Sequence, residues 1–96
     1  MRAVVYKGPF QVAVEEVPEP RLEADTDALL EVELSAICGS DLHTHCGRRR
    51  GPTPVVLGHE AIGRVVAVGS GLDTSWVERR ITWTLTDSCG LCDPCT

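Results

Sequence analysis

The sequence lacks the long apolar segments that membrane and secreted proteins carry. No stretch of its 96 residues approaches the roughly 20 apolar positions that a membrane-spanning helix needs. The first residues, 1–7, also lack the apolar segment of a secretory signal peptide. We therefore expect a cytoplasmic protein with no membrane partner.

Basic charge is also scarce. The chain has 9 Lys and Arg residues against 14 Asp and Glu residues, which gives a net charge of −5. Binding to a phosphate backbone requires a basic surface, so we expect no nucleic-acid partner. The one basic run is Arg48-Arg49-Arg50, and such short runs most often face water. Its alternative role is to bind a phosphate group, which a guanidinium can hold through two parallel hydrogen bonds.

The chain has 5 cysteines, which are its first positive signal. In a cytoplasmic protein, clustered cysteines bind metal or take part in catalysis more often than they form disulfides. An odd number of cysteines also argues against a closed disulfide framework. Metal binding is therefore the leading interpretation.

The remaining sequence indicates many short strands and almost no helix. A strand is expected over 28–36, because apolar and polar residues alternate from Leu30 to Ala36. Ser40 or Asp41 can cap a short helical turn that ends at His45. Further strands are expected at 2–7, 10–15, 55–57, 63–68 and 80–85, with a hairpin turn at 69–71. This pattern is typical of a mainly β fold, a small barrel or sandwich in a single domain. We expect a barrel that is incomplete, because the sequence stops within a metal motif.

Three cysteines near the end form the strongest local pattern. Cys89, Cys92 and Cys95 are each separated by two residues, and such thiolates can converge on one soft cation. A closed tetrahedral site needs a fourth ligand, which we expect shortly after Thr96. The rival interpretation is an iron–sulfur cluster, because ferredoxins also space cysteines by two residues.

A second candidate site combines Cys38 with His59 and Glu60. Thiolate, imidazole and carboxylate are all natural zinc ligands. Both candidate sites fall where strands give way to loops, as functional sites often do. Taken singly, a cysteine is more often a small buried apolar residue than a ligand.

Three motifs occur in order along the chain. They are Cys38-Gly39-Ser40-Asp41-x-His43, then Gly58-His59-Glu60-x-x-Gly63-x-Val65-x-x-Val68-Gly69, then Cys89-x-x-Cys92-x-x-Cys95. Together they resemble the zinc-dependent medium-chain alcohol dehydrogenase family over nearly the whole chain. The resemblance implies that residues 1–96 form an incomplete N-terminal GroES-like β-barrel, with residues 86–96 starting a zinc-binding lobe. It also implies that the Rossmann domain, which binds NAD or NADP, is not present in this chain.

The resemblance implies two zinc sites. Cys38 and His59 resemble the ligands of the catalytic zinc, and Glu60 resembles the acidic neighbour that ligates it in polyol dehydrogenases. Asp41 resembles the carboxylate that orients the zinc-binding histidine. The three cysteines of the last motif resemble ligands of the structural zinc.

The resemblance also implies a reaction. Ser40 resembles the hydroxyl that receives the substrate proton, and His43 resembles the relay that passes it to solvent. The full-length protein would be a homo-oligomer that interconverts a secondary alcohol and a ketone by hydride transfer to NAD or NADP. Gly39-Ser40 is closest to the sorbitol and polyol dehydrogenases, and residues 82–90 resemble a phosphonate- or cyclitol-associated branch. The fragment alone is expected to be inactive.

Two other functions remain open from the sequence. One is a non-catalytic zinc-binding module, which would explain the cysteines but leave Ser40 and His43 without a role. The other is an iron–sulfur electron-transfer fragment.

Overall fold

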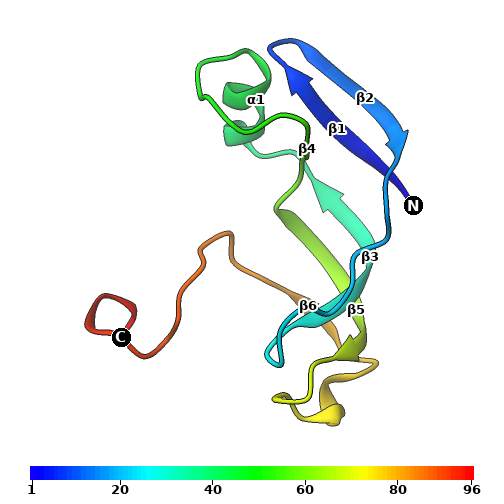
Figure 1. Cartoon of the computed structure of the whole chain (residues 1–96), viewed down its shortest axis with the longest axis vertical. Coiled ribbons are helices and arrows are strands. Elements are labelled where there is room, and N and C mark those ends of the chain that lie inside the picture. Colours follow the sequence, from blue (N-terminus) through cyan, green and yellow to red (C-terminus); the bar gives the residue numbers. More distant parts are fainter.

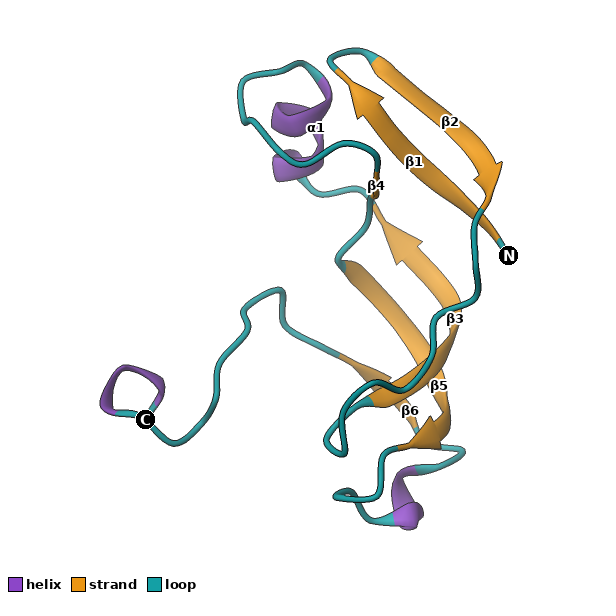
Figure 2. Ribbon diagram, in the orientation of Figure 1, coloured by secondary structure: helices purple, strands orange, loops and turns teal.

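The computed structural model describes residues 1–96. The strands form two open antiparallel sheets (Figure 1). Strands make up most of the regular structure, with one short α-helix between them (Figure 2). The strand orders are β2-β1-β4 and β3-β5-β6. The elements are β1 (Arg2–Gly8), β2 (Gln11–Glu16), β3 (Ala28–Ala36), α1 (Gly39–His45), β4 (Val55–Val56), β5 (Glu60–Val68), η1 (Thr74–Trp76), β6 (Arg80–Thr82) and η2 (Asp93–Cys95). The expected mainly β fold with an open barrel is confirmed.

The first sheet supports the helix. Its central strand, β1, pairs with β2 and with β4, and this position buries Val5 and Tyr6. The turn between β1 and β2 reaches α1 through Phe10. The backbone N–H of Phe10 donates to the carbonyl of His45 at 2.6 Å, and the two rings meet edge to face with centroids 5.3 Å apart. The hairpin and α1 are therefore held together at both backbone and side-chain level.

The second sheet is built around β5. This strand supplies Val65, the most deeply buried apolar side chain of the molecule, and pairs with β3 and β6. Gly63 approaches β3 so closely that a Cβ there would lie 2.6 Å from the carbonyl oxygen of Glu31. The pairing of β3 with β5 shifts register twice, and Val32 and Leu34 remain 56% and 69% exposed. An apolar part of β3 is therefore left open.

A second close approach joins residues 24–27 to the turn at 69–71. The N–H groups of Gly69 and Gly71 donate to the carbonyls of Asp27 and Asp25, each at 2.8 Å. A Cβ on Gly69 would lie 2.3 Å from the carbonyl oxygen of Asp25. The link from β5 to β6 is longer than the expected hairpin turn, because it also contains η1. The glycines allow this docking of two backbones.

The fully buried core is small. Of 96 residues, 5 are buried, and the apolar ones among them are Val5, Tyr6 and Val65. After β6 the chain leaves both sheets and ends in a separate small loop (Figure 1). No helix in the structure combines the length and apolar character needed to cross a bilayer.

Candidate metal centres

Cys38 lies where β3 gives way to α1 and is the residue that precedes the helix. Its backbone N–H donates to Oδ2 of Asp41 at 3.0 Å, and its carbonyl accepts from the N–H of Asp41 at 3.1 Å. This reciprocal arrangement satisfies backbone groups that a helix start leaves free. The expected short helical turn through His45 is present, and of the two expected capping residues Asp41 caps it, from inside its first turn.

His59 lies between β4 and β5 and faces the same turn of α1. Its Nδ1 is 3.5 Å from Oδ1 of Asp41, and its Nε2 is 3.3 Å from Oγ of Ser40. The residue before it, Gly58, has φ +119°, a backbone conformation that favours glycine and turns the chain into β5. A carboxylate at Nδ1 favours the proton on that nitrogen, which leaves Nε2 with a free lone pair for a metal.

The structure brings Cys38, His59 and Glu60 together from both sides of this junction. The candidate ligand atoms of the three residues all lie within 4.8 Å of one another. One thiol, one imidazole and one carboxylate form a donor set that suits zinc, and three protein ligands leave a fourth position open. The donor chemistry of these residues therefore fits a catalytic zinc.

His43, the expected proton relay, lies outside this cluster, as do the nearby side chains of His45 and Cys46. His43 is exposed in the last turn of α1, and no hydrogen bond joins its ring to Ser40. His45 packs against Phe10, and the thiol of Cys46 donates to the carbonyl of His43 at 3.6 Å. The structure therefore does not bring His43 into contact with the hydroxyl that it was expected to serve.

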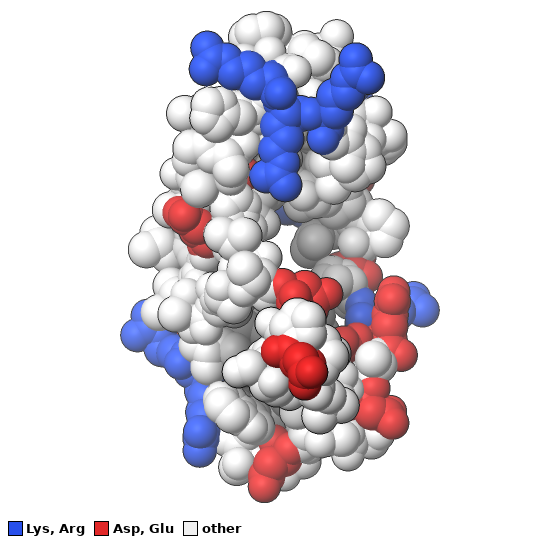
Figure 3. All heavy atoms as spheres, turned by 90° about the vertical axis from the view of Figure 1, so that its left-hand side faces the viewer, with Lys and Arg blue, Asp and Glu red and all other residues white.

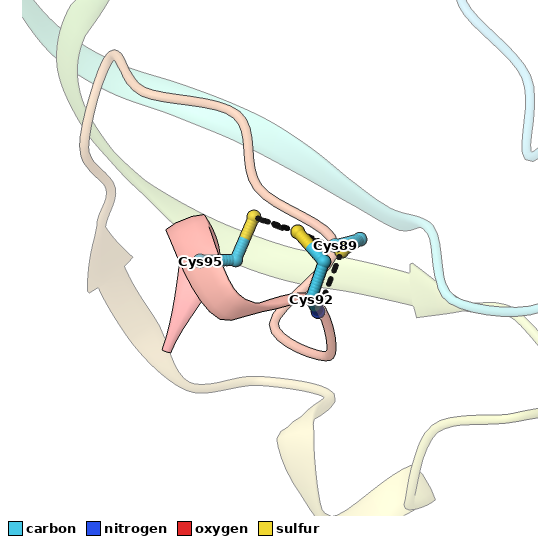
Figure 4. A group of neighbouring side chains, drawn as sticks. All are labelled: Cys89, Cys92 and Cys95. Atoms are coloured by element: carbon cyan, nitrogen blue, oxygen red, sulfur yellow. Dashed lines mark hydrogen bonds between the residues drawn. The ribbon is translucent and has the colours of Figure 1, made fainter.

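Cys89, Cys92 and Cys95 form a second cluster in the terminal loop, with side chains turned toward one another (Figure 4). Their Sγ atoms are 3.2, 3.4 and 3.7 Å apart. A tetrahedral zinc with Zn–S bonds of about 2.3 Å would set such separations at about 3.8 Å. The three thiols are free and already spaced close to what one shared ion requires.

The local backbone favours a thiolate at one of these positions. The N–H groups of Leu91 and Cys92 donate to the sulfur of Cys89 and lower its pKa to about 6. Hydrogen bonds with the side chains of Cys95, the larger contribution, and of Cys89 raise the pKa of Cys92. The thiolate is the form that binds metal, so this loop supplies one ligand in the required state near neutral pH.

A cavity lies beside the first cluster, and two arginines of the exposed 48–50 run reach it. Arg49 and Arg50 line it together with Ser40 and His59. The run lies in the loop between the motifs of Cys38 and His59, and this sequence position agrees with its place at the cavity.

The alcohol dehydrogenase GroES-like domain model matches residues 24–96. This chain belongs to that family. The zinc-type alcohol dehydrogenase B of Aspergillus flavus is 44% identical to this GroES-like domain over 95 residues, which cover 99% of the chain and 22% of the relative. The sorbitol dehydrogenase of Bacillus subtilis is 35% identical over 99 residues, covering 99% of the chain and 28% of the relative.

Solved structures agree with the fold of this alcohol dehydrogenase domain. The alcohol dehydrogenase TADH from Thermus sp. ATN1 matches with a TM-score of 0.92 at 43% identity, over 99% of this chain and 28% of that chain. The expected family and the GroES-like fold are therefore confirmed. The chain spans about a quarter of the length of the relatives it matches.

Proposed function

We propose that the intact protein containing this chain is a zinc-dependent dehydrogenase that interconverts a secondary alcohol of polyol type and a ketone, with NAD or NADP as the hydride acceptor. One observation carries the proposal: Cys38, His59 and Glu60 converge within 4.8 Å, and Ser40 lies beside His59. Membership of the alcohol dehydrogenase family and the similarity to a sorbitol dehydrogenase support it.

In this proposal Cys38, His59 and Glu60 hold the catalytic zinc, and Cys89, Cys92 and Cys95 hold the structural zinc. Zinc bound at the first site would supply Lewis-acid polarisation of the alcohol oxygen. Asp41 keeps the ring of His59 oriented with Nε2 toward the site.

Ser40 is the proposed acceptor of the alcohol proton. Its Oγ lies 3.3 Å from Nε2 of His59 and is partly buried at the wall of the adjoining cavity. His43 is the proposed outlet to solvent, since it is exposed and histidine suits proton transfer near neutral pH. Because no hydrogen bond joins the two side chains, the transfer between them would run through water.

The proposal extends to the setting of the protein. We infer a cytoplasmic homo-oligomer whose partner is a small alcohol or polyol. Five free cysteines suit a reducing compartment. The homo-oligomer rests on the family resemblance.

A substrate panel on the intact, zinc-loaded protein tests the function. We expect NAD- or NADP-dependent oxidation of polyols with higher kcat/KM than of simple primary alcohols. Best turnover of simple primary alcohols would contradict the polyol assignment. Absence of turnover with zinc bound would favour the non-catalytic module, and a brown iron-containing protein would favour the iron–sulfur alternative.

A further inference from the structure

A cavity of about 270 Å³ opens beside the candidate catalytic centre and has two arginines in its wall. Ser40 and His59 line one part of it, and Arg49 and Arg50 line another. Asp41 is its one acidic lining residue, and its two carboxylate oxygens already face the N–H of Cys38 and Nδ1 of His59. The cavity therefore holds the proposed reacting groups, Ser40 and His59, together with two arginines that form no ion pair with Asp41.

Hydrogen bonds hold the arginine loop against the helix that carries Ser40. The N–H of Arg49 donates to the carbonyl of His43, and the N–H of Gly47 donates to the carbonyl of Thr44, each at 3.1 Å. Gly47 has φ +80°, which reverses the chain directly after α1. Oγ1 of Thr44 donates in turn to the carbonyl of Ser40 at 3.1 Å. The loop and Ser40 are therefore fixed to the same short helix.

The arginines of this loop form no ion pair within the chain. None of Arg48, Arg49 and Arg50 has a carboxylate within 4.0 Å, whereas Arg64 and Arg80 on the second sheet pair with glutamates. Figure 3 shows basic side chains gathered at the upper end of the face over α1 and the loop that follows it. Unpaired guanidinium groups are suited to binding an anion through paired hydrogen bonds.

We propose that Arg49 and Arg50 form a subsite for a phosphate group carried by the substrate, which makes phosphorylated polyols the preferred substrate class. This inference rests on the proposed dehydrogenase function. At about 270 Å³ the cavity is close to the lower end of the size range of small-molecule sites, so it suits a short chain that carries one phosphate. A phosphate of the nucleotide cofactor would present the same chemistry, and the experiment below separates the two sources.

The test compares neighbouring arginines in the intact, zinc-loaded protein. The double variant Arg49→Gln/Arg50→Gln removes the two cavity-lining charges, and Arg48→Gln removes a charge from the same loop outside the cavity wall. We expect the double variant to lower kcat/KM for a polyol phosphate roughly tenfold to hundredfold, as loss of charged hydrogen bonds predicts. For the unphosphorylated polyol, the double variant should keep its kcat/KM within about threefold of the parent. Arg48→Gln should do so with both substrates.

Two readouts with inorganic phosphate complete the test. We expect phosphate to inhibit competitively with the alcohol and to raise the melting temperature of the parent and of Arg48→Gln, but not of the double variant. Competition with the nucleotide would assign the phosphate to the cofactor and overturn the substrate subsite. Equal losses in Arg48→Gln, or no loss in the double variant, would also overturn it. If no alcohol is oxidised, the proposed function fails, and the phosphate-dependent melting temperature still decides whether the anion site exists.

Discussion

At the scale of single residues, Asp41 connects the start of a helix to a candidate metal ligand. One carboxylate oxygen accepts from the N–H of Cys38, and the other lies 3.5 Å from Nδ1 of His59. The two candidate zinc ligands are therefore positioned through one side chain. A substitution of Asp41 should therefore alter the positions of both Cys38 and His59.

We predict that Asp41→Asn weakens zinc binding at the Cys38–His59–Glu60 site. The amide loses the negative charge that faces Nδ1 of His59, and loss of such a supporting group costs roughly tenfold to hundredfold in metal affinity. Competition with a chromophoric zinc chelator measures this in the intact protein. Glu19→Gln is the control, because Glu19 is exposed and lies outside both zinc motifs and the terminal lobe. If only the melting temperature fell, Asp41 would act through the helix start alone.

The residues of the candidate site could be named from the sequence because few side chains bind zinc and they occur at characteristic spacings. Their mutual contacts could not be named. The bond from Cys38 to Asp41 depends on the conformation of the first helical turn, which two competing capping residues left ambiguous. The placement of Arg49 and Arg50 beside Ser40 depends on how the loop folds back, and a run of charges carries no such information.

At the scale of elements, the turn after β5 is fixed by contact with the segment before β3. Gly69 is the residue of this turn where an added Cβ would come closest to the opposite backbone. A side chain there would meet backbone atoms, which cannot rotate away as a flexible side chain can. The turn therefore depends on glycine for space.

We predict that Gly69→Ala destabilises the intact protein by about 1–3 kcal/mol, as overpacking of a filled position typically does. The new Cβ would lie 2.3 Å from the carbonyl oxygen of Asp25, so the two segments must separate. Urea unfolding measures the change. Gly39→Ala is the matched control, since a Cβ there meets nothing within 4 Å and alanine favours a helix. Equal stability of the two variants would show that the contact is not needed.

The elements themselves were predicted to different degrees for physical reasons. Strand β3 has the predicted bounds, and apolar and polar residues alternate along most of its length, from Leu30 to Ala36. Strand β6 ends at Thr82 although the alternation continues to residue 85. Its pairing with β5 covers only Arg80, Ile81 and Thr82, and a strand needs a partner as well as a pattern. The end of β6 could not be predicted from its own sequence, because it depends on the register of β6 against β5.

At the scale of the whole molecule, the two candidate metal centres lie in different structural settings. The first is at the junction of the sheets and the short helix, and the second is in a terminal loop that has left both sheets (Figure 1). The loop has no packed core of its own to hold it in shape, since Leu91 is 88% exposed. The two centres should therefore respond differently to loss of a ligand.

We predict two zinc ions per intact chain, which can be removed separately. His59→Ala should lose one zinc and the activity with little change in melting temperature, because other contacts hold that junction. Cys92→Ser should lose the other zinc and lower the melting temperature by at least about 5 °C, because a structural zinc contributes directly to folding. Elemental analysis and calorimetry measure both effects. One zinc or fewer in the fully loaded parent, or an unchanged melting temperature in Cys92→Ser, would contradict this assignment.

The open edge of β3 has a consequence for how the 96-residue chain behaves on its own. No other strand of the chain pairs with the outer side of β3, and Val32 and Leu34 on this strand add exposed apolar surface next to that free edge. An unprotected edge with apolar side chains is a template for a second copy. The net charge of −5 provides mutual repulsion between copies, which added salt screens. In a test tube, the isolated domain should therefore scatter more light as its concentration and the ionic strength rise, and it should precipitate before it reaches the concentrations needed for crystallisation.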